Sequence, residues 1–327
     1  MTWQGKKVLV TGAGGFIGSH LAETLVRKGA EVRAMIHYNG AGLWGWLDDS
    51  ELAGDMEIYA GDIADPESVR RAMEDVDTAF HLAALIAIPY SYHAPRSYLR
   101  TNVEGTMNVL QAARDFATRR VVHTSTSEVY GTARRVPIDE EHPLQGQSPY
   151  SASKIAADKI AESFHCAFEV PVVTVRPFNT FGPRQSARAV IPTIISQALD
   201  GKVVKLGSTT PTRDLTLVSD TVTGFLKAGE AVGCEGRTVN LGTGREISIG
   251  DLRDLIGNLM GLELSSETES QRVRPPASEV ERLLSDNSLA KELLDWEPET
   301  SLEDGLKQTI AWIKENQDRF RQGVYAI

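Results

Sequence analysis

A tyrosine and a lysine stand four residues apart in the segment Tyr150-Ser151-Ala152-Ser153-Lys154. This spacing predicts that both side chains project from one face of a helix, one turn apart. An ammonium group beside a phenol favours the phenolate, so a tyrosine that ordinarily titrates near pH ~10 becomes a usable base near neutrality. The pair therefore predicts general-base chemistry on a substrate hydroxyl.

A hydroxyl-rich segment, 123–131, precedes this pair and follows a predicted strand. The carboxyl ends of parallel strands are where α/β sheets bind their ligands. Thr126 lies at such an end, and we expect it to hydrogen-bond the same substrate hydroxyl that Tyr150 deprotonates. A Tyr-x-x-x-Lys pair alone is common by chance, and this strand end makes it far more specific.

A glycine-rich turn, Thr11-Gly12-Ala13-Gly14-Gly15-Phe16-Ile17-Gly18, directly follows the first predicted strand and opens a helix. Gly12 permits the tight turn, Gly15 allows a pyrophosphate to approach the backbone, and Gly18 lets helix and strand pack closely. The helix N-terminus offers free N–H groups to phosphates. The turn predicts a dinucleotide cofactor held by Gly12, Gly15, Phe16, Ile17 and Gly18.

The end of the second strand has no acidic residue to hold an adenosine ribose. Ile36 takes that place and is followed by His37 and Asn39. The missing carboxylate favours NADP weakly over NAD, because Arg33 or His37 would attract a 2′-phosphate; alternatively His37 is only a surface residue. After the third strand, Asp62 and Ile63 are placed to contact the adenine, or Asp62 simply caps the next helix.

Strands and helices alternate through the first half of the chain, which predicts an α/β fold with a Rossmann-type, doubly wound parallel sheet. The expected strands are 7–11, 32–36, 57–60, 78–82, 121–124 and 172–176, with helices at 18–29, 65–73, 102–116 and 151–168. We assign residues 1–177 to a dinucleotide-binding domain, joined by returning segments within about 212–245. Residues 178–211 and 246–327 form a smaller mixed C-terminal substrate lobe, with helices at 249–262, capped by Ser248, and 302–320.

The bulk composition restricts the partners. The chain has 327 residues and a formal net charge of −10, which argues against nucleic acid as the main ligand. Its two cysteines are far apart and in no metal-type spacing, so we expect free thiols and no metal site. No signal peptide or apolar stretch of membrane-spanning length is present, which favours a cytoplasmic protein that does not bind membranes.

Taken together, these motifs resemble the nucleotide-sugar epimerase/dehydratase family of extended short-chain dehydrogenases, over nearly the whole chain. The matching pieces are the glycine turn, His81-Leu82-Ala83-Ala84, Asn102 with Gly105-Thr106, Thr126, Tyr150/Lys154, Arg176-Pro177-Phe178-Asn179, Arg213-Asp214 and Asp295-Trp296-Glu297-Pro298. The triplet Thr126-Ser127-Glu128 is similar to that of GDP-mannose 4,6-dehydratases and of UDP-glucuronate decarboxylases. The whole chain is most similar to the 4,6-dehydratases of legionaminic-acid-type pathways, whose implied substrate is GDP-N-acetylglucosamine.

The resemblance implies a mechanism and its alternatives. Thr126, Ser127, Glu128, Tyr150 and Lys154 are the implied catalytic residues, with Glu128 as the base that removes the proton from sugar carbon 5. A 4-epimerase needs only Thr126, Tyr150 and Lys154, whereas a decarboxylase shares the triplet but needs a basic group for the substrate carboxylate. The alternative from a different functional class is a regulator that binds a dinucleotide without catalysing a reaction. The complete set of catalytic residues argues against this alternative.

The resemblance also implies further contacts and an assembly. It adds Leu82, Ala83, Ala84, Thr124, Tyr150, Lys154 and Pro177 to the contacts of a tightly bound, recycled cofactor. The implied contacts of the nucleotide-diphosphate sugar are Thr126, Asn179, Arg188, Val190, Pro192, Lys205, Arg213, Arg274 and Glu279. Helices 102–116 and 151–168 are implied to pair into the four-helix bundle of a homodimer.

Overall fold

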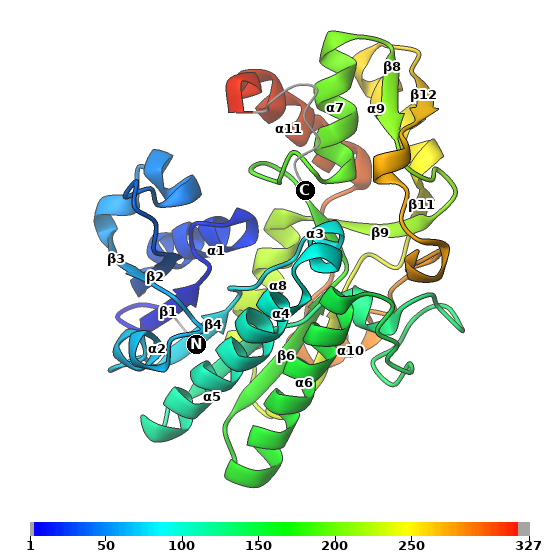
Figure 1. Cartoon of the computed structure of the whole chain (residues 1–327). Coiled ribbons are helices and arrows are strands. Elements are labelled where there is room, and N and C mark those ends of the chain that lie inside the picture. Colours follow the sequence, from blue (N-terminus) through cyan, green and yellow to red (C-terminus); the bar gives the residue numbers. More distant parts are fainter. Residues whose placement is uncertain (1–2, 320–327) are drawn as a thin grey trace.

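The computed structural model describes residues 3–319, and its centre is a parallel sheet with the strand order β10-β6-β5-β4-β1-β2-β3 (Figure 1). Each neighbouring pair runs parallel. The strands are β1 (Lys7–Thr11), β2 (Glu31–His37), β3 (Met56–Gly61), β4 (Thr78–His81), β5 (Arg120–Thr124), β6 (Val172–Pro177) and β10 (Thr238–Leu241).

Apolar side chains bury both faces of this sheet. In β1, Val8 and Val10 belong to one core and Leu9 to another, because successive side chains of a strand point to opposite faces. Helices α1 (Phe16–Arg27) and α8 (Val218–Glu230) contribute to the first core. Helices α2 (Pro66–Ala72), α5 (Gly105–Asp115) and α6 (Pro149–Phe168) contribute to the second, and α5 and α6 lie side by side (Figure 1).

The predicted fold class is confirmed, and the predicted elements of the first half are present within a few residues of their expected limits. One helix differs in form, because the residues before α5 form a π-helix, Leu99–Glu104. From the returning segments within 212–245, residues 238–241 join the main sheet as β10, and residues 218–230 cover the sheet as helix α8. The strand before α8, β9 (Thr212–Leu217), instead pairs with β7 (Asn179–Phe181) and β11 (Glu246–Ser248) in a separate sheet.

The C-terminal lobe has its own apolar core, to which Ile194, Val204, Ile256 and Leu306 belong. As predicted, Ser248 caps a helix by accepting a hydrogen bond of 3.0 Å from an N–H of the first turn. The elements of this lobe are α7 (Val190–Asp200), β8 (Val203–Leu206), α9 (Ile249–Met260), β12 (Ser265–Thr268) and α11 (Leu302–Glu315). Three further α-helices are short, namely α3 (Ile88–His93), α4 (Pro95–Tyr98) and α10 (Ser288–Leu294).

Several sequence-based expectations concern features beyond the fold. Across residues 3–319, no helix has the length and apolar character needed to cross a membrane. Both cysteines are free, with Cys234 buried and Cys166 exposed. The same residues contain no group of three or more His, Cys, Asp or Glu side chains that fits a metal ion.

Candidate active site

The predicted cofactor residues meet at one edge of the main sheet. Because the strands are parallel, the loops after β1 to β6 all leave from their carboxyl ends, and β1 lies between β2 and β4, where the strand order reverses. This edge carries Gly12, Gly15, Phe16, Ile17, Gly18, His37, Asn39, Asp62, Ile63, Leu82, Ala83, Ala84, Thr124 and Pro177.

The glycine turn has the shape that a diphosphate needs. Gly12 has a positive φ of 72°, and a Cβ atom on Gly18 would lie only 2.2 Å from the Gly12 carbonyl oxygen. Within the described chain, no side chain caps the start of α1 at Gly15, so the first N–H groups of the helix point to the edge of the sheet without a side-chain acceptor. These features fit a bound dinucleotide diphosphate.

The loop after β4 is fixed against this turn. The Thr11 hydroxyl accepts hydrogen bonds of 3.1 Å from the N–H groups of both Leu82 and Ala83. A Cβ atom on Gly12 would lie 2.9 Å from the Ala83 nitrogen. The glycine turn and the His81–Ala84 segment therefore form one continuous wall.

The ends of β2 and β3, where the adenosine of the cofactor is expected to bind, offer less positive charge than the sequence suggested. Arg33 donates to Glu57 at 2.8 Å and to the carbonyl of Ala72 at 2.8 Å, so its guanidinium is held on the neighbouring strand and helix. His37 ends β2 and is exposed. Asp62 accepts the N–H of Ala64 at 2.9 Å within the loop, and the next helix is capped by Asp65, so the prediction that Asp62 caps this helix is wrong.

Helix α6 places the tyrosine and lysine as their spacing predicts. A capping box between Ser148 and Ser151 fixes the start of the helix, with reciprocal bonds of 3.0 and 3.1 Å. Tyr150 lies in the first turn and Lys154 in the next, and both are buried. The Lys154 ammonium donates a hydrogen bond of 2.6 Å to the carbonyl of Thr124 at the end of β5.

The remaining catalytic candidates lie beside that tyrosine. The Thr126 side chain hydrogen-bonds the Tyr150 phenol and also accepts the N–H of Glu128 at 3.3 Å. Thr126 thereby caps the short helix Ser127–Tyr130, which follows β5. Ser127 and Glu128 are both buried. The structure thus brings together the five residues that the sequence assigned to catalysis.

The electrostatics of Tyr150 differ from the expectation. Burial raises the pKa of its phenol, the Thr126 hydrogen bond acts in the opposite direction, and the charge of Glu128 raises the pKa further. The Lys154 ammonium donates to the Thr124 carbonyl, and the net shift of the phenol pKa is upward. Burial lowers the pKa of Lys154 itself to about 8, against the opposing charge of Asp158.

A buried polar network behind Lys154 was not predicted from the sequence. Burial works against the ionised form of Asp158, but hydrogen bonding to His123 and the charge of Arg176 hold its pKa at about 2. Asp158 accepts hydrogen bonds of 2.8 Å from Ser125 and 2.9 Å from Arg176. Its position four residues after Lys154, on the same face of α6, was the available signal.

Asn102 connects the catalytic helix to the loop after β4. Its side-chain amide donates to the Ser153 hydroxyl at 2.9 Å and exchanges bonds of 2.8 and 2.9 Å with the backbone of Leu85. Asn102 belongs to the π-helix, and its side chain is buried. This link fixes the helix that carries Tyr150 relative to the wall of the cofactor site.

A cluster of arginines and carboxylates forms the far side of the site. Arg213, buried on β9, donates to Glu279 at 3.4 Å. A terminal nitrogen of Arg274 (Nη1) lies 3.6 Å from Glu279 and 4.0 Å from Glu128, and it makes no hydrogen bond within residues 3–319. The predicted substrate residues Arg213, Arg274 and Glu279 therefore meet next to the predicted base.

Comparisons with known proteins identify the family to which the chain belongs. Residues 9–309 match the family model described as GDP-mannose 4,6 dehydratase. The chain belongs to this epimerase/dehydratase family. It is 33% identical to a UDP-glucose 4-epimerase of Mycolicibacterium smegmatis over 94% of this chain and 98% of that protein. A dTDP-glucose 4,6-dehydratase of Xanthomonas campestris pv. campestris is 32% identical, with 94% and 93% covered.

A solved structure supports the same relationship. A double mutant of the dTDP-glucose 4,6-dehydratase of Streptomyces venezuelae, determined with NAD, superposes with a TM-score of 0.87 at 29% identity, covering 96% of this chain and 98% of that one. Among these similar proteins are both epimerases and dehydratases. Membership of the epimerase/dehydratase family therefore leaves the reaction to be decided from the site.

The other predicted substrate residues lie on β7, on α7 and the loop before it, and on β8. Arg188 lines a cavity of about 290 Å³ together with Tyr98, whose ring centroid is 6.2 Å from that of Tyr150. Asn179 is on β7, and its side-chain oxygen is buried without a partner among the described residues. Val190 and Pro192 lie in the first turn of α7, and Lys205 is exposed on β8.

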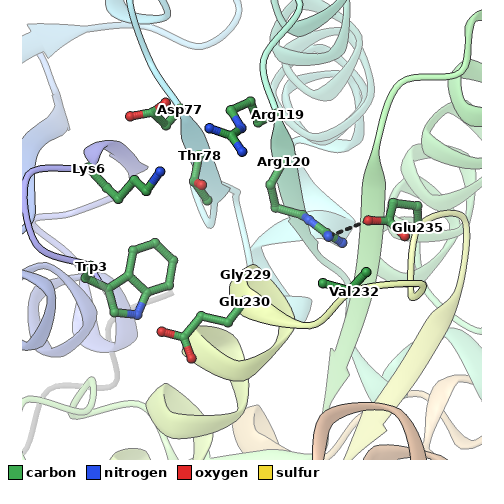
Figure 2. A pocket seen from close by; sticks show the side chains of 10 residues that line it. All are labelled: Trp3, Lys6, Asp77, Thr78, Arg119, Arg120, Gly229, Glu230, Val232 and Glu235. Carbon is green, nitrogen blue, oxygen red and sulfur yellow. Dashed lines mark hydrogen bonds and ion pairs between the residues drawn. The ribbon is translucent and has the colours of Figure 1, made fainter. Parts of the chain in front are cut away.

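A different cavity, of about 260 Å³, lies at the opposite edge of the main sheet (Figure 2). It opens where β4 and β5 begin, whereas Tyr150 and the glycine turn lie where strands end. Acidic and basic side chains are balanced there, and Arg120 pairs with Glu235 at 2.5 Å. The cavity is lined by Trp3, Lys6, Asp77, Thr78, Arg119, Arg120, Gly229, Glu230, Val232 and Glu235. It takes no part in the predicted chemistry.

Proposed function

We propose that this protein is a cytoplasmic nucleotide-sugar 4,6-dehydratase that converts a nucleotide-diphosphate hexose, GDP-N-acetylglucosamine, to its 4-keto-6-deoxy derivative. The observation that carries the proposal is the buried carboxylate of Glu128 beside Thr126 and Tyr150. A 4-epimerase has no use for a second base, whereas a dehydratase requires one.

The chain's residues divide the work as follows. Tyr150 removes the proton from the hydroxyl on sugar carbon 4, and Thr126 holds that hydroxyl in place. A nicotinamide dinucleotide held by the glycine turn would supply reversible storage of the hydride that leaves carbon 4 and returns to carbon 6, and its positive charge would favour the Tyr150 phenolate. Because the ketone acidifies carbon 5, Glu128 can remove the carbon 5 proton. Glu128 gives that proton to the hydroxyl on carbon 6, which leaves as water. Carbon 5 is then protonated from solvent, and Tyr150 returns its proton to solvent.

The arginines of the cluster suit the substrate's diphosphate. A nucleotide diphosphate adds negative charge to a chain that already has a net charge of −10, so local cations are required. Arg213 is buried and Arg274 has a donor nitrogen without a hydrogen-bond partner in the described part of the chain. We infer that these two side chains bind the diphosphate, with Asn179 and Arg188 nearer the sugar.

One observation favours a second candidate function. A UDP-glucuronate decarboxylase needs a basic group for the substrate carboxylate, and Arg274 lies 4.0 Å from Glu128. Mass spectrometry after incubation with GDP-, UDP- and dTDP-linked hexoses and with UDP-glucuronate separates the candidates. A dehydratase product has lost water, a decarboxylase product has lost carbon dioxide, and an epimerase product has the mass of its substrate. We expect loss of water from GDP-N-acetylglucosamine.

The cofactor preference is a separate prediction. No carboxylate at the end of β2 repels a 2′-phosphate, and with Arg33 bound to Glu57 the attraction rests on His37 alone. We expect NADP to bind at least as well as NAD. Denaturing the purified protein and identifying the released dinucleotide, followed by titration with both forms, checks this. Release of NAD alone together with poor NADP affinity contradicts it.

The predicted homodimer also has a test. The surface of α5 and of the π-helix before it includes two large apolar side chains, Leu99 and Met107, which are 52% and 42% exposed. We propose that this face and α6 pair with a second copy in a four-helix bundle. Light scattering at micromolar concentration should give a dimer mass, and Met107→Glu should give a monomer mass. A monomeric parent protein contradicts the prediction.

A further inference from the structure

A tryptophan-containing loop after β2 is packed against the glycine turn. We call residues 38–46 the tryptophan loop. The Trp46 N–H donates a hydrogen bond of 3.0 Å to the carbonyl of Gly14. A Cβ atom on Gly14 would lie 2.4 Å from the Trp44 carbonyl oxygen, and one on Gly45 would lie 2.4 Å from the Gly14 oxygen. The two backbones therefore meet so closely that both positions require glycine.

This contact explains a glycine that the phosphate turn does not need. The roles of tight turn, phosphate approach and helix packing fall to Gly12, Gly15 and Gly18. Gly14 is additional to them, and the atoms nearest to its missing side chain belong to the tryptophan loop. The loop is itself well ordered internally, because Asn39 accepts the N–H of Leu43 at 3.0 Å and donates to its carbonyl at 2.7 Å.

The same loop reaches the C-terminal lobe. The indole of Trp46 packs edge-on against Trp312 of α11, with ring centroids 5.4 Å apart. On the same ring, the guanidinium of Arg319 lies 5.1 Å from the centroid, and Arg319 also pairs with Asp49 at 2.6 Å. Figure 1 shows α11 (red) on the same side of the molecule as the segment between β2 and β3 (blue). Trp46 thus joins the glycine turn, through its backbone, to the C-terminal lobe, through its ring.

We propose that Trp46 is a positioning residue that slows release of the bound dinucleotide by tying the glycine turn to α11. The inference rests on the dinucleotide site of the proposed function. A recycled cofactor must stay bound through many turnovers, and it leaves only when the walls around its diphosphate move apart. Removing the indole leaves the loop attached to the turn but deletes both ring contacts with the C-terminal residues, so that only the ion pair between Asp49 and Arg319 remains and the turn moves more freely.

The test measures dissociation of radiolabelled NAD from the purified protein during a chase with excess unlabelled NAD. Since an edge-on aromatic pair and a cation–π contact are lost together, we expect Trp46→Ala to release NAD about tenfold faster than the parent protein. Trp46→Phe keeps an aromatic ring and should stay close to the parent rate. Leu43→Ala, an exposed position of the same loop, is the matched control and should leave the rate unchanged.

The outcomes are distinguishable. Release from Trp46→Ala at the parent rate overturns the proposal. If Trp46→Ala does not fold, Trp312→Ala removes the same contact from the side of α11, and a parent rate in that variant also overturns it. Equal acceleration in Leu43→Ala would show general loosening of the loop and would count against Trp46. The assay contains no sugar, so a protein that binds NAD but dehydrates nothing refutes the proposed function alone.

Discussion

Glu128→Gln is expected to start the reaction and then stop. Tyr150, Lys154 and Thr126 are intact in this variant, so oxidation at sugar carbon 4 should proceed and the absorbance of reduced nicotinamide should appear when substrate is added. The amide cannot accept the carbon 5 proton, so loss of water should fall by roughly 10²–10⁴, the usual contribution of a general base. Stopped-flow absorbance and mass spectrometry of the quenched reaction measure both steps.

The matched control for this variant is Glu279→Gln. Glu279 is the other carboxylate of the cluster, and it contacts Arg213 and Arg274 but is not placed on the strand end that carries Thr126. We expect its amide to weaken substrate binding without separating oxidation from dehydration. Formation of the 6-deoxy product by Glu128→Gln at close to the parent rate would remove the main support for a dehydratase.

Tyr150→Phe should abolish the first step and leave the fold intact. The phenol is buried and its hydroxyl hydrogen-bonds Thr126, so the variant loses one contact and gains no cavity. We expect turnover to fall by roughly 10²–10⁴ while nucleotide binding, followed by thermal shift, is retained. No reduced nicotinamide should accumulate, which distinguishes this variant from Glu128→Gln.

Tyr98→Phe provides the control for that substitution. Its ring lies against Tyr150, but its hydroxyl donates to the carbonyl of Ala87 and not to the catalytic group. Turnover in Tyr98→Phe should stay within about tenfold of the parent, since no proton-transfer group is removed. Near-normal turnover in Tyr150→Phe would contradict its assignment as the base.

The sequence predicted those features that depend on local spacing. The Tyr150–Lys154 pair follows from the helical repeat, and the glycine turn follows from a strand, a tight turn and a helix within a few residues. The order of strands and helices followed from the alternation of apolar and amphipathic segments. The capped helix start at Ser248 was recognisable because a serine stands directly before the helical segment.

Contacts between distant segments were beyond this reasoning. Arg274 lies far along the chain from Glu128, and only the structure shows that their side chains are 4.0 Å apart. Residue spacing also carries no information on burial, which raises the pKa of the Tyr150 phenol, opposite to the shift that a nearby ammonium favours. Likewise, residue spacing could not predict that the Arg33 guanidinium donates a hydrogen bond to Glu57 on the neighbouring strand.

The most direct measurement of the central claim is the reaction of the unmodified protein with GDP-N-acetylglucosamine in deuterium oxide, analysed by mass spectrometry and proton NMR. A dehydratase that uses Glu128 at carbon 5 must return a proton from solvent to that carbon, while the hydride moved from carbon 4 to carbon 6 stays within the molecule. We predict a product that has lost one water and carries one deuterium at carbon 5. A product that keeps its full mass and carries no deuterium on carbon would contradict the account.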